Sequence, residues 1–168
     1  MRKIFCVILL FSMISIAAFA EEGWGIGVVG SFGGYWGSSD VSAGGALSLK
    51  APTIPIYWGV TLTARSGILG LGVTGDYPFL RGNLVPDINL DWYLNLGGWG
   101  TFYTGSNHTS IALGARAPLG LSWRIPKVEI IEIFLSLSPS IGVAIDFDDG
   151  IDFPAGGWPV ELGFRIWF

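Results

Sequence analysis

The residues of this chain that could do chemistry are ionisable side chains that recur at alternate positions within apolar segments. Five bases and six acids share this placement: Lys50, Arg65, Arg116, Arg124 and Arg165, with Asp76, Asp87, Asp91, Glu132, Asp146 and Glu161. Pairs of carboxylates can carry out general acid–base catalysis when their pKa values are pushed apart. Here the acids come with matching bases, so we interpret the set as structural ion pairs and expect no catalytic site.

The remaining chemical candidates are few. The chain has one histidine, His108, and one cysteine, Cys6, which leaves little material for a zinc site or a nucleophilic triad. The acidic run at 146–152 resembles a calcium loop only loosely, because its glycine and carboxylates are out of step with the EF-hand spacing. We therefore predict a solvated loop there, and no enzyme activity, metal or cofactor.

Gly25, Gly27 and Gly30 form a formal dinucleotide-binding fingerprint. That motif requires a strand before it and a helix after it. Here it follows the amino-terminal leader and runs into a stretch of loop residues. We expect these glycines instead to make room on the crowded inner side of a strand.

The amino-terminal segment has the organisation of a secretory signal peptide. Arg2 and Lys3 precede an apolar run, and Ala18-Phe19-Ala20 forms a small-x-small cleavage site. We predict cleavage of residues 1–20, which leaves one domain over 21–168; a retained membrane anchor is the less favoured alternative. The mature chain would carry 7 basic and 13 acidic residues and no cysteine, a balance that argues against nucleic-acid binding.

Alternation with period two runs through the mature chain and indicates β-strands. It is clearest at 87–96, where five apolar residues alternate with five polar ones. The predicted strands are 23–32, 46–51, 56–64, 68–77, 87–96, 110–124, 131–146 and 158–168. We expect 78–86 to be a connection and 147–157 an acidic loop. Bulges or breaks are expected at Gly97-Gly98, Pro118 and Pro139.

The chemical character of the two strand faces indicates which face contacts lipid and which is enclosed. Export, an apolar composition and the lack of a mature apolar run of about 18–20 residues leave a closed barrel as the way to satisfy backbone groups in lipid. Arg or Lys facing lipid at the bilayer midplane costs about 2–4 kcal/mol. We therefore predict an all-β, eight-stranded antiparallel up-and-down transmembrane β-barrel, with the eleven charged residues in a lumen filled by side chains.

An even number of strands places both ends of the chain on one side, the periplasmic side in bacterial barrels. Short turns are then expected there after the second and sixth strands, and long outer loops after the first and seventh. Trp24, Trp58 and Trp123 lie near strand ends on the same side and are predicted to form an interfacial girdle.

The last strand completes the pattern. Its apolar face, Val160, Leu162, Phe164, Ile166 and Phe168, ends on an aromatic carboxy-terminus. This looks like the β-signal by which barrel-assembly machinery recognises outer-membrane barrels. With GARAPLGLSWR (114–124), IEIFLSLSPSIGV (131–143) and ELGFRIWF (161–168), the chain over 23–168 resembles small eight-stranded bacterial outer-membrane barrels. The resemblance is to the OmpA-barrel and OmpW-like group, especially its spirochaetal members.

The resemblance implies an outer-membrane location, contact with membrane lipid and the assembly machinery, and no catalytic residue. It leaves several functions open. The first is a structural barrel with a polar, filled lumen whose outer loops contact the surroundings. The alternatives are an OmpW-like conduit for small hydrophobic solutes and an adhesin that binds a host ligand. A secreted soluble β-sandwich or carrier is the alternative from another class. An apolar cavity interrupting the charged lumen would favour the conduit.

Overall fold

The computed structural model describes residues 23–168 except 66, 106–107, 127, 129 and 148, so the expected signal peptide at 1–20 lies outside the described residues. The elements are β1 (Gly25–Gly34), β2 (Val41–Lys50), β3 (Tyr57–Arg65), β4 (Ile68–Val85), the 3-10 helix η1 (Pro86–Ile88), β5 (Leu90–Gly105), β6 (His108–Arg116), β7 (Leu119–Arg124), β8 (Ile131–Leu137), β9 (Ser140–Asp146), β10 (Gly150–Ala155) and β11 (Val160–Trp167). In the described part of the chain, no helix is long and apolar enough to cross a membrane.

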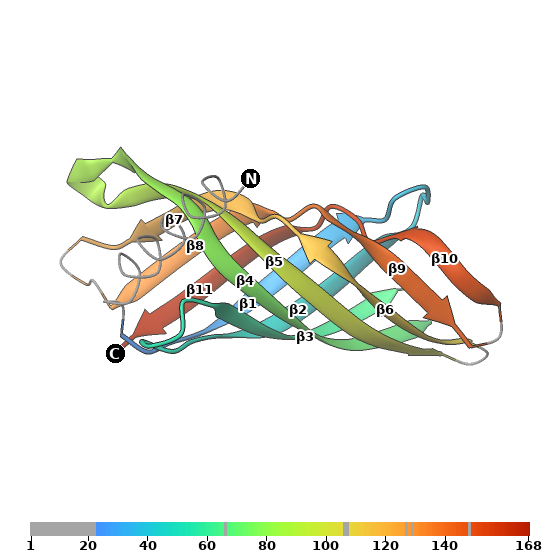
Figure 1. The fold of residues 1–168 in the computed structure, drawn as a ribbon. Helices are drawn as coiled ribbons and strands as arrows, with labels where there is room; N and C mark the ends of the chain where they lie inside the picture. The colour runs from blue at the N-terminus through green and yellow to red at the C-terminus, as the bar shows by residue number, and fades with distance from the viewer. Residues whose placement is uncertain (1–22, 66, 106–107, 127, 129, 148) are drawn as a thin grey trace, which may run out of the picture.

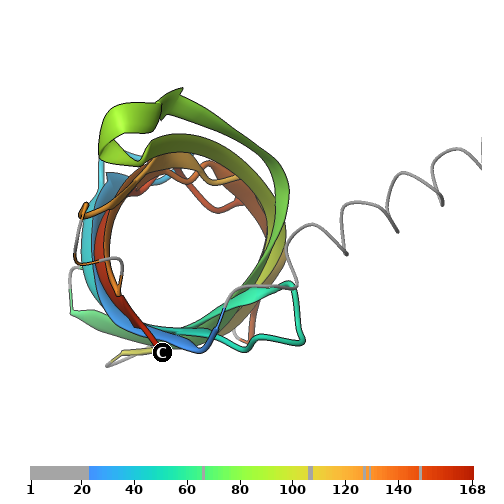
Figure 2. The ribbon, with the colours of Figure 1, turned by 90° about the vertical axis from the view of Figure 1, so that its left-hand side faces the viewer.

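Antiparallel pairing joins these strands into a closed barrel (Figures 1 and 2). Three barrel strands are each divided in two: β6 continues as β7, β8 as β9, and β10 as β11. β5 pairs with both β6 and β7, and β1 pairs with β11 to close the ring. Over the described residues this gives eight antiparallel barrel strands, which confirms the predicted fold class of an all-β, eight-stranded barrel.

The two strand-internal prolines interrupt the ladder without opening the wall. The Asn95 N–H donates to the Pro118 carbonyl at 2.8 Å, and the Ala117 N–H donates to the Pro139 carbonyl at 2.9 Å. Proline lacks the N–H but keeps its carbonyl as an acceptor, so each break costs one ladder bond and no more. The breaks expected at both prolines are confirmed. The prediction of a bulge at Gly97-Gly98 was wrong, since the pairing of β5 with β4 stays in register there.

The β4–β5 hairpin differs most from the sequence-based expectation. The predicted connection at 78–86 is strand almost throughout, and the fifth strand begins at Leu90 rather than at 87. The register shifts between Pro78 and Leu80, where Phe79 is the extra residue of a bulge. Two adjacent apolar residues, Phe79 and Leu80, break the period-two pattern and conceal the strand. The hairpin extends beyond one end of the barrel (green in Figure 1).

Both ends of the described chain lie at that same end of the barrel, the terminal end, where the Phe168 N–H donates to the Trp24 carbonyl at 2.8 Å. At the opposite end, the far end, two residues separate β3 from β4, three separate β9 from β10, and six separate β1 from β2. The prediction of long outer loops after the first and seventh strands was wrong, because β2 begins at Val41 and β10 occupies much of the expected acidic loop. The longest projection is instead the β4–β5 hairpin.

Burial is inverted relative to an ordinary soluble domain. Leu71, on the outer face of β4, is 61 % exposed, whereas Lys50 is 1 % and Arg165 5 % exposed on the inner face. Glycine and proline aside, the buried apolar residues in the described part of the chain are Ala112, Phe134 and Trp167. Soluble proteins rarely expose a continuous apolar band of this kind or bury this many charges. The interior of the barrel is therefore its polar part, and any site built from charged groups must lie there.

Candidate functional site

The barrel gathers most of the eleven predicted charged residues on its inner face. Lys50, Asp76, Glu132, Asp146 and Arg165 are buried, and Arg116, Arg124 and Glu161 are partly buried. Asp91 lies on the inner side near the terminal end, and Arg65 lies close to the far rim. Asp87 does not belong to this group: it is exposed in η1, because the hairpin carries it beyond the barrel.

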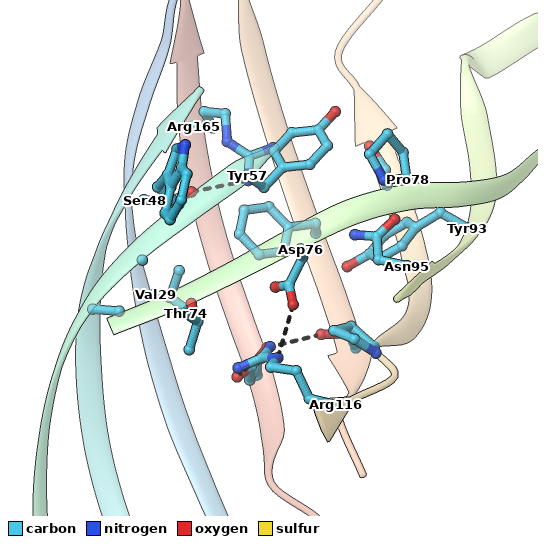
Figure 3. A pocket seen from close by; sticks show the side chains of 18 of the residues that line it. Val29, Ser48, Tyr57, Thr74, Asp76, Pro78, Tyr93, Asn95, Arg116 and Arg165 are labelled. Carbon is cyan, nitrogen blue, oxygen red and sulfur yellow. Dashed lines mark hydrogen bonds and ion pairs between the residues drawn. The ribbon is translucent and has the colours of Figure 1, made fainter. Parts of the chain in front are cut away.

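Arg116 is the centre of the first cluster, which spans the lumen (Figure 3). From β6, its Nη2 donates to both carboxylate oxygens of Glu161 on β11, at 2.8 and 3.0 Å, and to the hydroxyl of Ser138. Its Nε lies 3.1 Å from the Asp76 carboxylate on β4. The Ser138 hydroxyl in turn donates to Glu161 at 2.7 Å. One guanidinium thus ties together strands that are not neighbours in the sheet.

Arg165 organises a second cluster nearer the terminal end. Its Nη1 donates to Glu132 on the adjacent β8 at 2.7 Å, and its Nη2 donates to Ser48 on β2 at 3.0 Å. The same Glu132 carboxylate accepts the Trp167 indole N–H at 2.8 Å and the Ser122 hydroxyl at 2.6 Å. Both Glu132 oxygens therefore have donors: Oε2 accepts from Arg165 and Trp167, and Oε1 accepts from Ser122, as a buried carboxylate requires.

Aromatic rings accommodate the excess cations of this terminal half. The Arg165 guanidinium lies 4.6 Å from the centroids of Tyr57 and Phe134, and Arg124 lies 4.6 Å from the centroid of Trp167. The Lys50 ammonium donates to the Ala51 carbonyl at 2.9 Å. Cation–π contacts of this kind are strongest where the cation is withdrawn from water. They let more bases than acids share this part of the lumen.

One ion pair was missed by reasoning from the sequence. Arg81 and Asp91 pair at 2.8 Å at the terminal end of the β4–β5 hairpin, and Asn83 also donates to Asp91 at 2.9 Å. The bulge at Phe79 shifts the alternation by one residue and turns Arg81 to the inner side. The adjacent Phe79-Leu80 pair was the available signal, since it marks where one strand phase ends and another begins.

Glycines make the filled lumen sterically possible. A Cβ on Gly25 would approach the Arg165 side chain to 2.7 Å, and a Cβ on Gly163 would collide with the ring of Phe134. Both glycines lie on the inner face, opposite the largest side chains. The expectation that the amino-terminal glycines clear space inside the barrel is confirmed for Gly25.

The far half of the interior, beyond the Arg116–Glu161 pair, has a different lining. It carries hydroxyl and aromatic side chains, and encloses a cavity of about 120 Å³ and, at the far end, one of about 300 Å³. The terminal half encloses a cavity of about 80 Å³. Asp146 is the buried carboxylate of the far half, where it accepts the Asp149 N–H at 3.1 Å. The other predicted acids lie in the terminal half or in the hairpin.

At the far rim, Arg65 forms an ion pair with Asp40 at 2.6 Å and lies 4.5 Å from the centroid of Tyr35. Asp40 is in the connection between β1 and β2. The hydrogen bond and charge of Arg65 hold the pKa of Asp40 below its ordinary value. Arg65 therefore links the β1–β2 connection to β3 at the far rim, and it is not part of the Arg116 or Arg165 cluster.

The predicted assembly signal lies on the outside of the barrel. Val160, Leu162, Phe164 and Phe168 are exposed, and Ile166 is half-buried, while β11 pairs with β1 on one side and β8 on the other. Trp24, Trp58 and Trp123 are also exposed on the outer surface. They lie at the terminal ends of β1, β3 and β7.

Several charged groups in the described part of the interior take part in ion pairs or cation–π contacts. In the described part of the chain, no group of three His, Cys, Asp or Glu side chains gathers to hold a metal ion. Comparison with protein-family profiles and with curated protein sequences found no match. The geometry of the barrel is therefore the basis for inferring a function.

Proposed function

We propose that this chain is an integral outer-membrane β-barrel protein of the OmpA-barrel or OmpW-like type, with a structural, non-catalytic role and a surface exposed to the environment. One observation carries the proposal: apolar side chains face outward around the barrel while charged ones are enclosed. In lipid, that arrangement avoids a cost of about 2–4 kcal/mol for each basic residue placed at the midplane.

The positions of the termini and of three tryptophans support one membrane orientation. Trp24, Trp58 and Trp123 lie at the terminal end, where indole rings would meet the headgroup region. Placing this end on the periplasmic side leaves the carboxy-terminal strand accessible to the barrel-assembly machinery. The short connections of the far end would then face the outside and offer the contact surface.

A closed lumen fits this role better than a conduit. The Arg116 cluster crosses the interior, and the cavity on its terminal side is only about 80 Å³. A sideways exit into lipid requires a gap in the wall, yet backbone hydrogen bonds bridge the breaks at Pro118 and Pro139. Binding of a host or environmental ligand at the far end remains compatible with a closed lumen.

A charge placed on the outer face tests the membrane location. We expect Leu71→Arg to lower the free energy of unfolding by up to about 2–4 kcal/mol in lipid vesicles, because Leu71 faces outward from the part of β4 that pairs with β3 and β5 in the barrel wall. In a soluble protein, an exposed Leu→Arg change stays within about 0.5 kcal/mol. The measurement is urea unfolding of vesicle-folded protein followed by a heat-sensitive shift in gel mobility.

Leu84→Arg is the matched control. Leu84 is also exposed, but lies in the hairpin that extends beyond the barrel end, so the loss should be smaller. Equal, negligible effects of both changes, together with recovery of the protein in the soluble fraction, would refute the proposed location.

A further inference from the structure

The far end of the barrel contains a hollow whose lining differs from the rest of the interior. This vestibule has a volume of about 300 Å³ and includes the aromatic residues Tyr35, Trp36, Trp99 and Tyr103 in its lining. Its size is at the lower limit of the roughly 300–1,000 Å³ typical of small-molecule sites. Four aromatic side chains around one hollow provide flat apolar surfaces whose polar edges can still form hydrogen bonds.

Trp99 supplies an unused donor to this hollow. It lies on the inner face of β5, and its indole Nε1 is buried without a hydrogen-bond partner among the described residues. By contrast, the Trp36 Nε1 donates to the Ser140 carbonyl at 2.5 Å, and the Trp167 Nε1 to Glu132. A buried donor left without an acceptor costs free energy, and native proteins rarely leave one unless it has a further role.

Acceptors and further donors line the same hollow. The Asp146 carboxylate is 5 % exposed, and the Ser110 hydroxyl is buried beside it on the paired strands β9 and β6. Asp152 and Arg65 contribute one acid and one base nearer the opening. The vestibule thus offers hydrogen-bond donors and acceptors together with aromatic faces, and carries both charge signs.

We propose that the vestibule binds a neutral sugar ring. A sugar hydroxyl can accept from the Trp99 indole, and the same or another hydroxyl of the ring can donate to the Asp146 carboxylate. The C–H-rich face of the ring can lie flat on an aromatic side chain. An organic cation would leave the Trp99 N–H without an acceptor and would meet Arg65, which already lies over Tyr35. An anion would face Asp146 and Asp152.

This inference rests on the proposed function, because the far end meets external sugars only if it faces outward. Binding itself can be measured in micelles, where membrane location has no influence. Leu71→Arg and fractionation test the location, and sugar titration tests the vestibule. The two proposals can therefore fail separately.

The experiment is a titration of the ¹⁵N-labelled full chain, folded in micelles of a polyoxyethylene detergent that contains neither sugar nor ammonium groups. Glucose, galactose and N-acetylglucosamine are the sugar probes; tetramethylammonium and sulfate are the charged probes. We expect at least one sugar to shift the Trp99 indole N–H resonance in a saturable way, while the resonance of outward-facing Trp58 stays in place. The Trp99 resonance is assigned from its disappearance in Trp99→Phe.

Trp99→Phe separates binding from structure. It removes the donor but keeps an aromatic ring, so we expect about a fivefold loss of sugar affinity by calorimetry, the effect of one hydrogen bond between neutral groups. Thermal stability should be unchanged or higher, because a buried unpaired donor disappears. Trp58→Phe is the matched control and should leave sugar affinity unchanged.

Two outcomes would overturn the proposal. One is that none of the sugars moves the Trp99 resonance at concentrations up to tens of millimolar. The other is that tetramethylammonium or sulfate binds at the vestibule more tightly than every sugar. Equal sugar affinity for the wild type and Trp99→Phe would remove the assigned role of the indole.

Discussion

The two halves of the barrel interior share one wall design but fill it differently. The terminal half holds the Arg116 and Arg165 clusters, packed against aromatic rings, with a cavity of about 80 Å³. The far half is lined by hydroxyl and aromatic groups and encloses the cavities of about 120 and 300 Å³. The same eight barrel strands pass through both halves, so the two halves differ in the side chains that these strands place inside.

This contrast suggests a division of roles. We propose that ion pairs between non-neighbouring strands hold the terminal half in one shape and block passage through it. Removing one partner of such a pair leaves the other charge buried and is far more costly than removing a neutral hydroxyl. The far half is freer to vary because most of its lining groups are uncharged, apart from Asp146, Asp152 and Arg65.

Arg116→Leu should cause the largest loss of stability. The change strands the Asp76 and Glu161 carboxylates in the interior, and we expect the free energy of unfolding to fall by about 3–5 kcal/mol. Urea unfolding in vesicles measures this change. Unaltered stability would remove the structural role assigned to the cluster.

A triple variant serves as the control for that experiment. Arg116→Met combined with Asp76→Leu and Glu161→Leu removes all three charges together. Replacing a complete buried ion cluster by apolar residues is often neutral or stabilising. The triple variant should therefore recover most of the stability that Arg116→Leu loses, which separates stranded charge from lost packing.

Conductance tests whether the terminal half is a plug. We expect the wild-type protein to show no stable, large, ohmic conductance in planar bilayers, because the Arg116 cluster crosses the lumen. Arg116→Ala removes the crossing side chain between the cavities of about 80 and 120 Å³, which both include Arg116 in their lining. This variant should show small intermittent steps. A wide open state in the wild type would contradict the closed lumen.

Thr101→Val should have a much smaller effect in the far half. Thr101 is buried on the inner face of β5, and valine keeps its shape while removing a neutral hydroxyl. We expect a loss of about 1 kcal/mol or less in the same unfolding measurement. A loss as large as that of Arg116→Leu would show that the two halves are equally constrained.

The Asp40–Arg65 pair should give the smallest effect, because both side chains are partly exposed to solvent at the far rim. Arg65 lowers the pKa of Asp40 in the folded state. Its contribution to stability is therefore present above the ordinary pKa of aspartate and is lost as the pH falls through the lowered pKa. In an NMR titration, Arg65→Gln should raise the pKa of Asp40 towards its ordinary value. An unchanged pKa would show that the pair does not form in solution.

Much of the wall could be predicted from local pattern. In 131–146, Glu132, Ser136 and Ser138 point inward as their alternation indicates, and the aliphatic residues between them line the outer surface. Side-chain direction in a strand depends only on the local backbone, so the inward and outward residues can be predicted without knowing which strands pair. The same reasoning failed at Phe79, where a bulge changes the phase and hides Arg81.

Alternation along the chain was enough to predict eight barrel strands and the apolar face of most of them. It could not predict that Arg116 meets both Asp76 and Glu161, that Asp87 lies outside the lumen, or that the far end is hollow. Contacts across a lumen depend on how neighbouring strands are staggered and where the barrel closes. Strand stagger and barrel closure are properties of the assembled sheet and cannot be predicted from the pattern of one strand.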